Sequence, residues 1–135
     1  MKHVAAIVLA LLIPVAALAA DVDKQKATNA AKSWLSSVDA NEYARSWKAA
    51  SAFLESHVTE AQWETAAKAA RDPMGPVIAR NIAAVDFTTT LPGAPDGKYV
   101  VVKFDTKFAN KAAAIETITM VMEGGRWKTA GYYVR

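Results

Sequence analysis

The chain has 135 residues, with 16 lysines and arginines, 13 aspartates and glutamates, and no cysteine. A chain of this length makes one domain with a core of its own, and without cysteine it has neither disulfide bonds nor a cysteine-based zinc site. The basic residues are spread along the sequence and form no run, which argues against a nucleic-acid-binding surface.

The first nineteen residues have the pattern of a secretory signal peptide. A short basic start is followed by an almost entirely apolar run from Val4 to Val15, and Ala17 and Ala19 place small side chains just before a cleavage site. The apolar run has about twelve residues, whereas a membrane-spanning helix needs about 20. Pro14 also interrupts its end. We therefore expect residues 1–19 to be a removable leader rather than a membrane anchor.

Cleavage between Ala19 and Ala20 leaves residues 20–135 as a single domain that is nearly neutral in charge. No second long apolar run follows, so we expect no stable membrane insertion. No cysteine stands near the cleavage site to carry a lipid. The sequence thus predicts a protein that is periplasmic or extracellular after cleavage.

Two amphipathic stretches open this domain, and each predicts a helix with one face in the core. The first has Asp21 and Asp23 at its positive end. Its apolar stripe comprises Ala27, Ala30, Ala31, Trp34, Leu35 and Val38. The second stretch begins with Tyr43 and Trp47, which are four residues apart, and continues through Leu54.

A capping box predicts the start of a third helix. Thr59 and Gln62 have the spacing at which each side chain can bond the backbone N–H of the other. The apolar stripe that follows comprises Trp63, Ala66, Ala67 and Ala70. Two prolines and a glycine then end the helix within residues 71–76. Arg71 in this loop has two interpretations, an anion-binding residue or a local cap of the preceding helix.

From Val77 onward, β-branched residues and alternation predict antiparallel strands. The first strand has Val85, Phe87, Thr89 and Leu91 on one face, and the second, over Tyr99–Phe108, has Val100, Val102, Phe104, Thr106 and Phe108 on one side. The third and fourth strands, at Ile115–Glu123 and Arg126–Arg135, flank a Gly-Gly hairpin turn. Three helices followed by about four strands indicate an α+β domain in which helices cover one face of a curved sheet.

The chain resembles a family of small exported bacterial proteins known as domain of unknown function 4019. The resemblance rests on Ala31-Lys32-Ser33-Trp34-Leu35, Asp39, Tyr43, Ser46-Trp47, Gln62-Trp63, Arg71-Asp72-Pro73-Met74-Gly75, Arg80, Leu91-Pro92-Gly93-Ala94-Pro95-Asp96-Gly97-Lys98-Tyr99, Glu116-Thr117, Gly125-Arg126-Trp127 and Gly131-Tyr132. It covers almost the whole mature chain and implies a cone-like fold of the nuclear transport factor two-like superfamily. Because that superfamily includes both enzymes and binding modules, the resemblance implies no particular activity.

The sequence lacks the usual signatures of catalysis. His57 is the only histidine outside the leader and stands beside a predicted helix end, where a surface or capping role is expected. A zinc site of histidine and cysteine ligands cannot be built, and none of the glycines opens a helix after a strand as a phosphate loop requires. We therefore expect neither a metal nor a cofactor.

Among the carboxylates on predicted strands, Glu116 stands out. Asp86 and Asp105 alternate with polar residues on faces that we assign to solvent. Glu116 shares its face with apolar side chains, so its carboxylate is predicted to look into the interior and to need a partner. Arg80 and Arg71 are the candidate partners. Such a group is either an internal ion pair that holds a helix end to the sheet or a carboxylate of raised pKa with a chemical role.

The aromatic residues have the same two interpretations, core packing or the wall of a ligand cavity. If a ligand is bound, the residues that we expect to contact it are Trp47, Arg71, Arg80 and Tyr132.

The leading hypothesis is a non-catalytic exported module that holds a small apolar or amphipathic ligand, or a protein partner, between the helices and the sheet. The first alternative is a cofactor-independent isomerase or hydro-lyase, with Glu116 as base and Tyr43 or Tyr132 as donor to an oxyanion. The second is a structural envelope protein that forms homo-oligomers through the exposed edge of its last strand.

Overall fold

Helices precede strands in the computed structural model, which describes residues 10–135. The elements are α1 (Val15–Asp39), α2 (Tyr43–Lys48), α3 (Ala52–His57), α4 (Glu60–Arg71), the short 3₁₀ helix η1 (Asp72–Met74), β1 (Val77–Thr88), β2 (Tyr99–Phe108), β3 (Lys111–Glu123) and β4 (Arg126–Val134). The basic start and the first part of the apolar run of the predicted leader, residues 1–9, lie outside the described residues. Across residues 10–135, no helix is both long and apolar enough to cross a membrane.

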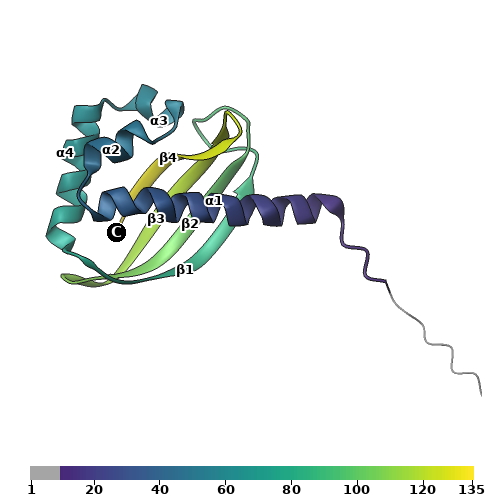
Figure 1. The fold of residues 1–135 in the computed structure, drawn as a ribbon, viewed down its shortest axis with the longest axis horizontal. Helices are drawn as coiled ribbons and strands as arrows, with labels where there is room; N and C mark the ends of the chain where they lie inside the picture. The colour runs from purple at the N-terminus through teal and green to yellow at the C-terminus, as the bar shows by residue number, and fades with distance from the viewer. Residues whose placement is uncertain (1–9) are drawn as a thin grey trace, which may run out of the picture.

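The four strands form one antiparallel sheet in the order β1-β2-β3-β4. Figure 1 shows α1 lying across one face of this sheet and extending beyond its edge at the N-terminal end, while α2, α3 and α4 gather at the other end of α1. The predicted α+β class with four antiparallel strands is therefore confirmed. Consecutive strands pair antiparallel because the connections between them, the longest of which is residues 89–98, are too short for the crossover that a parallel pair needs.

The core lies between α1 and the sheet. Alternating side chains of β2 point toward the helices and are buried, as predicted for Val100, Val102, Phe104, Thr106 and Phe108. The predicted stripe of the first helix is buried except for Ala30, which is partly exposed. Trp34 stands at the centre, with its ring centroid 5.9 Å from that of Trp63 and 5.6 Å from that of Tyr132. These side chains fill the space between the helices and the sheet.

The second predicted helix is in fact two short helices, α2 and α3, so the prediction of three helices was wrong by one. Ser51 explains the break. Its side chain accepts a 3.1 Å hydrogen bond from the backbone N–H of Leu54 and caps α3. Its own backbone N–H donates to the carbonyl of Thr129 on β4 at 2.9 Å, so the chain between the helices is tied to the sheet.

Three other boundaries differ from the prediction. Helix α1 begins at Val15, so Asp21 and Asp23 lie inside it and not at its end. Strand β1 stops at Thr88 because the Thr88 side chain bonds the backbone of Thr90 and turns the chain away. Strand β3 begins at Lys111, four residues before the predicted start. The capping box of α4 is confirmed, with both reciprocal bonds formed.

Helix α4 buries a different stripe from the predicted one. Trp63, Ala67 and Arg71 are buried, at intervals of four residues, whereas Ala66 and Ala70 are exposed. Arg71 therefore belongs to the last turn of the helix and faces inward. The sequence prediction had assigned it to the loop that follows.

Candidate functional site

A cluster of charged and hydroxyl side chains lies where the ends of α1 and α4 meet the sheet, buried on its inner side and partly exposed at Asp39. It consists of Asp39, Arg71, Arg80, Thr106, Glu116 and Tyr132, and we call it the charge cluster. The two helices supply Asp39 and Arg71. Each strand supplies one of the other four residues, in the order Arg80 on β1, Thr106 on β2, Glu116 on β3 and Tyr132 on β4.

The strand register brings these four side chains together. Arg80 pairs directly with Thr106 across β1 and β2, and Glu116 pairs with Phe104, the inward residue next to Thr106 on β2. Tyr132 pairs with Ile118, the inward neighbour of Glu116. Alternate residues of a strand share a face, so all four point toward the helices.

Glu116 is the centre of the cluster and is fully buried. Its Oε1 accepts hydrogen bonds from Arg80 Nε at 2.7 Å and from the Thr106 hydroxyl at 2.6 Å. Its Oε2 accepts from the Tyr132 hydroxyl at 2.6 Å and from Arg80 Nη2 at 3.2 Å. Four donors therefore surround one carboxylate, which satisfies a charge that would otherwise be costly to bury.

Asp39 is the outer acid of the cluster and binds both arginines. Arg80 donates to it from Nη1 at 2.8 Å and from Nη2 at 2.9 Å, and Arg71 donates from Nη2 at 2.9 Å. Burial alone would raise the pKa of Asp39. The hydrogen bonds and positive charges of Arg80 and Arg71 outweigh that effect, and the pKa lies below its usual value of 3.8.

Arg71 is buried and lies between the two acids. One of its terminal nitrogens, Nη1, is 3.8 Å from Glu116 Oε2, and its guanidinium carbon lies 4.8 Å from the centroid of the Phe108 ring. Desolvation opposes its charge, yet Tyr132, Asp39 and Glu116 together keep its pKa above the ordinary value. Two arginines and two carboxylates give the cluster no net charge, as expected for ions that are removed from water.

The two tyrosines that sequence analysis proposed as proton donors lie in different places. Tyr132 belongs to the cluster, and desolvation and the nearby charge of Glu116 raise the pKa of its hydroxyl. The Tyr43 hydroxyl lies 2.9 Å from side-chain oxygens of Asn41 and Asp72 and makes no hydrogen bond to Glu116. Burial and the Asp72 carboxylate raise the pKa of Tyr43 to about 12. Only Tyr132 therefore reaches the buried acid.

The proposed ligand contacts divide in the same way. Arg71, Arg80 and Tyr132 lie together in the charge cluster and hydrogen-bond to other protein groups there, although the buried Arg71 Nε has no acceptor among residues 10–135. Trp47 lies apart from them, packs against the core and donates its indole N–H to the carbonyl of Val58 at 2.9 Å.

The remaining candidates are on the surface, where sequence analysis had placed them. Asp86 and Asp105 are exposed. His57 is also exposed, with Nδ1 2.8 Å from the carbonyl of Phe53 and its ring stacked beside that of Phe53. None of the three contributes to the charge cluster.

Sequence reasoning missed Asp39 and Thr106 as members of the cluster. Thr106 did carry a signal, because a polar residue on an otherwise apolar strand face indicates a buried polar partner. Asp39 carried none, because its position at the end of α1 predicts only a solvated helix terminus. Its role depends on the turn that brings α4 and β1 beside it.

A pocket of about 430 Å³ opens on the outer side of the cluster, lined by Asp39, Asn41, Arg71, Asp72, Gly75 and Pro76. Its wall carries two carboxylates and an arginine that is already paired. Over residues 10–135, the structure contains no group of three or more histidine, cysteine or acidic side chains that could hold a metal ion. The ion pairs of the cluster join the ends of α1 and α4 to β1 and β3.

Comparison with known protein families gives a match over most of the chain. The model of a family described as "Protein of unknown function (DUF4019)" matches residues 30–132, a range that contains every member of the charge cluster. No curated protein matches the sequence.

Proposed function

The chain belongs to the DUF4019 family of proteins of unknown function, and from this premise we propose that it is an exported, non-catalytic binding module. The fold that we propose is the cone-like arrangement of the nuclear transport factor two-like superfamily. The ligand is a small apolar or amphipathic molecule or a protein partner.

The non-catalytic assignment rests on one observation, the four hydrogen bonds that surround Glu116. A general base needs a free lone pair within about 3 Å of the proton that it removes. Each of the two carboxylate oxygens of Glu116 already accepts two hydrogen bonds, and the carboxylate is enclosed by the protein. This geometry supports a structural role, in which the acid holds the helix ends to the sheet.

Export is supported by the first described residues. Residues 10–19 are all exposed, and the buried positions of α1 begin only at Ala27. The exposed segment includes large apolar side chains, with Leu12 93% exposed. Such surface is unfavourable in water, and cleavage before Ala20 would remove it without taking a buried side chain from the core.

The enzyme hypothesis remains the second candidate because of the 2.6 Å hydrogen bond between Tyr132 and Glu116. A carboxylate and a tyrosine in contact are the groups that an isomerase of this kind would use. The same carboxylate also accepts hydrogen bonds from Arg80 and Thr106, however, and the Tyr132 hydroxyl already donates its hydrogen bond to Glu116. A substrate would have to displace these bonds, so we favour the binding module.

Self-association through the last strand is the third candidate. The outer edge of β4 is partly occupied, since the backbone N–H of Ser51 donates to the carbonyl of Thr129. Strand β1 forms the other edge of the sheet, and Ile78 and Ile82 on it are exposed. A pairing between copies is therefore better supported at β1 than at β4.

Native mass spectrometry of protein recovered from the periplasm of cells that express the full chain tests the proposal. We expect a monomer that begins at Ala20 and carries an additional non-covalent mass. A variant with Ala17→Glu and Ala19→Glu, which blocks the cleavage site, serves as the control and should keep the leader. A bare monomer would contradict the binding function, a bare homo-oligomer would favour self-association, and an uncleaved wild-type chain would contradict export.

A further inference from the structure

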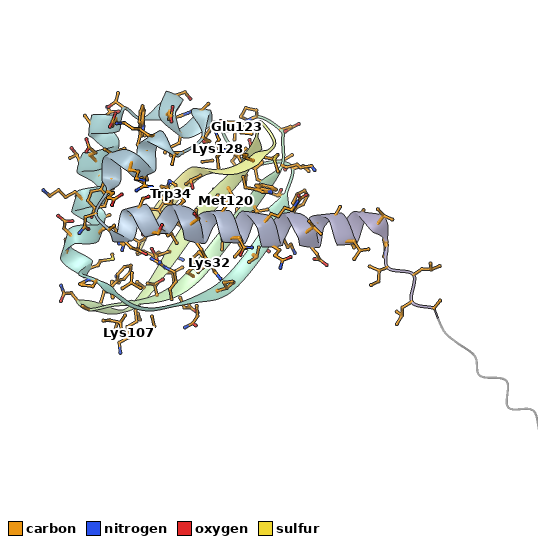
Figure 2. All side chains as sticks on the ribbon, in the orientation of Figure 1. Lys32, Trp34, Lys107, Met120, Glu123 and Lys128 are labelled. Carbon is orange, nitrogen blue, oxygen red and sulfur yellow. The ribbon has the colours of Figure 1, made fainter. Side chains whose placement is uncertain are left out.

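A second pocket lies on the opposite side of α1 from β1, between α1, α2 and the β3–β4 hairpin. We call it the α1–β4 pocket. It has a volume of about 330 Å³, and its wall includes Ser33, Trp34 and Ser37 of α1, Arg45 of α2, and Trp127 and Lys128 of β4. In Figure 2 the labelled side chains of Trp34, Met120 and Lys128, which all line this pocket, lie in the same region. Its size suits a small ligand.

Three apolar side chains, those of Trp34, Trp127 and Met120, contribute to the wall of the pocket, together with serine and threonine side chains. All three side chains are buried in the core, so they offer a fixed surface and lose little freedom when a ligand binds. Aromatic rings and methionine are the side chains that ligand pockets most often use for flat or aliphatic groups.

The outer wall is positively charged. Arg45 and Lys128 line the pocket, and none of the residues that line it is acidic. Each cation has a carboxylate nearby, with Glu42 3.1 Å from Arg45 and Glu123 3.8 Å from Lys128. The pairs are partly or largely exposed to solvent, and such pairs hold side chains only weakly, so both cations are available to an anion in the pocket.

Trp127 adds an unused hydrogen-bond donor. Its side chain is only 9% exposed, and its indole nitrogen is buried without an acceptor among residues 10–135. The indoles of Trp34, Trp47 and Trp63, in contrast, all donate to protein oxygens. An unpaired buried donor costs about 1–3 kcal/mol. A ligand acceptor that reached this nitrogen, after a small movement of the side chains that cover it, would offset this cost.

The pocket beside the charge cluster has the opposite character. Asp39 and Asp72 line it, and its one arginine already bonds to Asp39. Arg71 has a buried Nε without an acceptor among residues 10–135, but its guanidinium is already paired with Asp39, and an anion there would face two carboxylates. Of the two sites, the α1–β4 pocket is therefore the one whose charge and surface match an amphipathic anion.

We propose that the α1–β4 pocket binds a small organic anion, a carboxylate with an aromatic or short aliphatic body. The body lies against Trp34, Trp127 and Met120, and the carboxylate faces Arg45 and Lys128. This inference rests on the proposed binding function, for which it names the ligand class and the site.

Phenylacetate is a suitable probe, and the four indole N–H signals in a ¹H–¹⁵N spectrum of the exported protein provide the readout. We expect the Trp127 signal, assigned with Trp127→Phe, to shift most on titration. The uncharged match, 2-phenylacetamide, should bind at least tenfold more weakly. Lys128→Gln and Arg45→Gln should each weaken phenylacetate binding about fivefold, whereas Lys103→Gln, at an exposed position of β2, should leave it unchanged.

Two results would overturn the inference. One is the absence of a phenylacetate-dependent shift at Trp127, and the other is equal binding by the wild type and the Arg45→Gln/Lys128→Gln double variant. If the double variant still carries a non-covalent mass when recovered from the periplasm, the pocket assignment fails while the binding function stands. If the wild type shows neither the mass nor the shift, both fail.

Discussion

Arg80 on β1 holds the carboxylate of Asp39, the last residue of α1, with hydrogen bonds of 2.8 and 2.9 Å. Arg71, the last residue of α4, donates to Oδ1 of the same carboxylate, the oxygen that also accepts from Arg80 Nη2. One acid thus joins the ends of two helices to the edge strand of the sheet. Because the side chain of Asp39 is 29% exposed, protons can reach this junction from solvent.

The junction should make the fold sensitive to acid. The pKa of Asp39 in the folded protein is below 3.8, the value expected when the chain is unfolded. Its ion pairs therefore contribute fully above about pH 4, and the contribution falls as the pH drops through 3.8 toward the lower folded pKa. Asp39→Asn should be less stable than the wild type at pH 7, and the difference should shrink below pH 4. Urea unfolding at several pH values measures this.

Asp105→Asn is the matched control for this prediction, because Asp105 is an exposed acid on the open face of the sheet. The free energy of unfolding of Asp105→Asn should differ little from that of the wild type at pH 7. If the free energies of unfolding of Asp39→Asn and the wild type differ by the same amount from pH 7 to pH 3, the ion pairs of Asp39 do not stabilise the fold.

Glu116→Gln tests the structural role of the inner acid. The amide keeps the size of the side chain but presents an N–H₂ group to donors that need an acceptor, and it leaves the charges of Arg71 and Arg80 less balanced. Removing one partner of a buried ion pair lowers the free energy of unfolding by about 3–5 kcal/mol. We expect a loss of that order in the free energy of unfolding, measured with urea, and almost none for Glu64→Gln at an exposed position of α4. Wild-type stability in Glu116→Gln would remove the support for a structural assignment.

Tyr132→Phe removes one donor to Glu116 and leaves the ring in place. A hydrogen bond to a charged group contributes about 1.5–3 kcal/mol, and the free energy of unfolding should fall by about that amount. Tyr133→Phe is the control, because Tyr133 is 54% exposed. Loss of its hydroxyl should change the free energy of unfolding by less than about 0.5 kcal/mol. Thermal unfolding followed by circular dichroism compares the two variants, and equal stabilities would contradict the assignment.

Ser51→Ala tests the break between α2 and α3. The substitution deletes the cap of α3 but keeps the backbone bond to Thr129, so we expect a loss of about 1 kcal/mol in the free energy of unfolding. Ser56→Ala is a suitable comparison because Ser56 is exposed near the end of the same helix, where its hydroxyl contacts the carbonyl of Phe53 and Nδ1 of His57 but caps no helix start. Similar stabilities for the two variants would mean that the cap contributes little.

The strands were most predictable from sequence where buried and exposed side chains alternate, as they do along β2. Strand β2 matches its predicted range, Tyr99–Phe108, and the predicted fourth strand differs from β4 only in its last residue. The helices were less predictable where a single side chain sets the boundary. The apolar spacing from Tyr43 to Leu54 is compatible with one helix, and only the tertiary contact of Ser51 with β4 shows why it divides.

Part of the charge cluster was predictable in the same way. An acid on an apolar strand face implies a buried cation, which led to Glu116 with Arg80 or Arg71, and the structure contains contacts with both. The bridging role of Asp39 was not predictable, because it depends on how far α1 extends and where α4 ends. The ends of these two helices are set by packing between elements, and no local sequence pattern encodes them.

The position of Asp21 and Asp23 gives the proposed cleavage a physical consequence. Both acids lie inside α1, which begins at Val15. When the bond before Ala20 is cut, the same acids become part of the first helical turn, where free backbone N–H groups favour carboxylates by about 0.3–1 kcal/mol each. Asp23 is already anchored there, 3.7 Å from Lys98. Maturation would thus create a helix start whose stabilising charges are present before the peptidase acts.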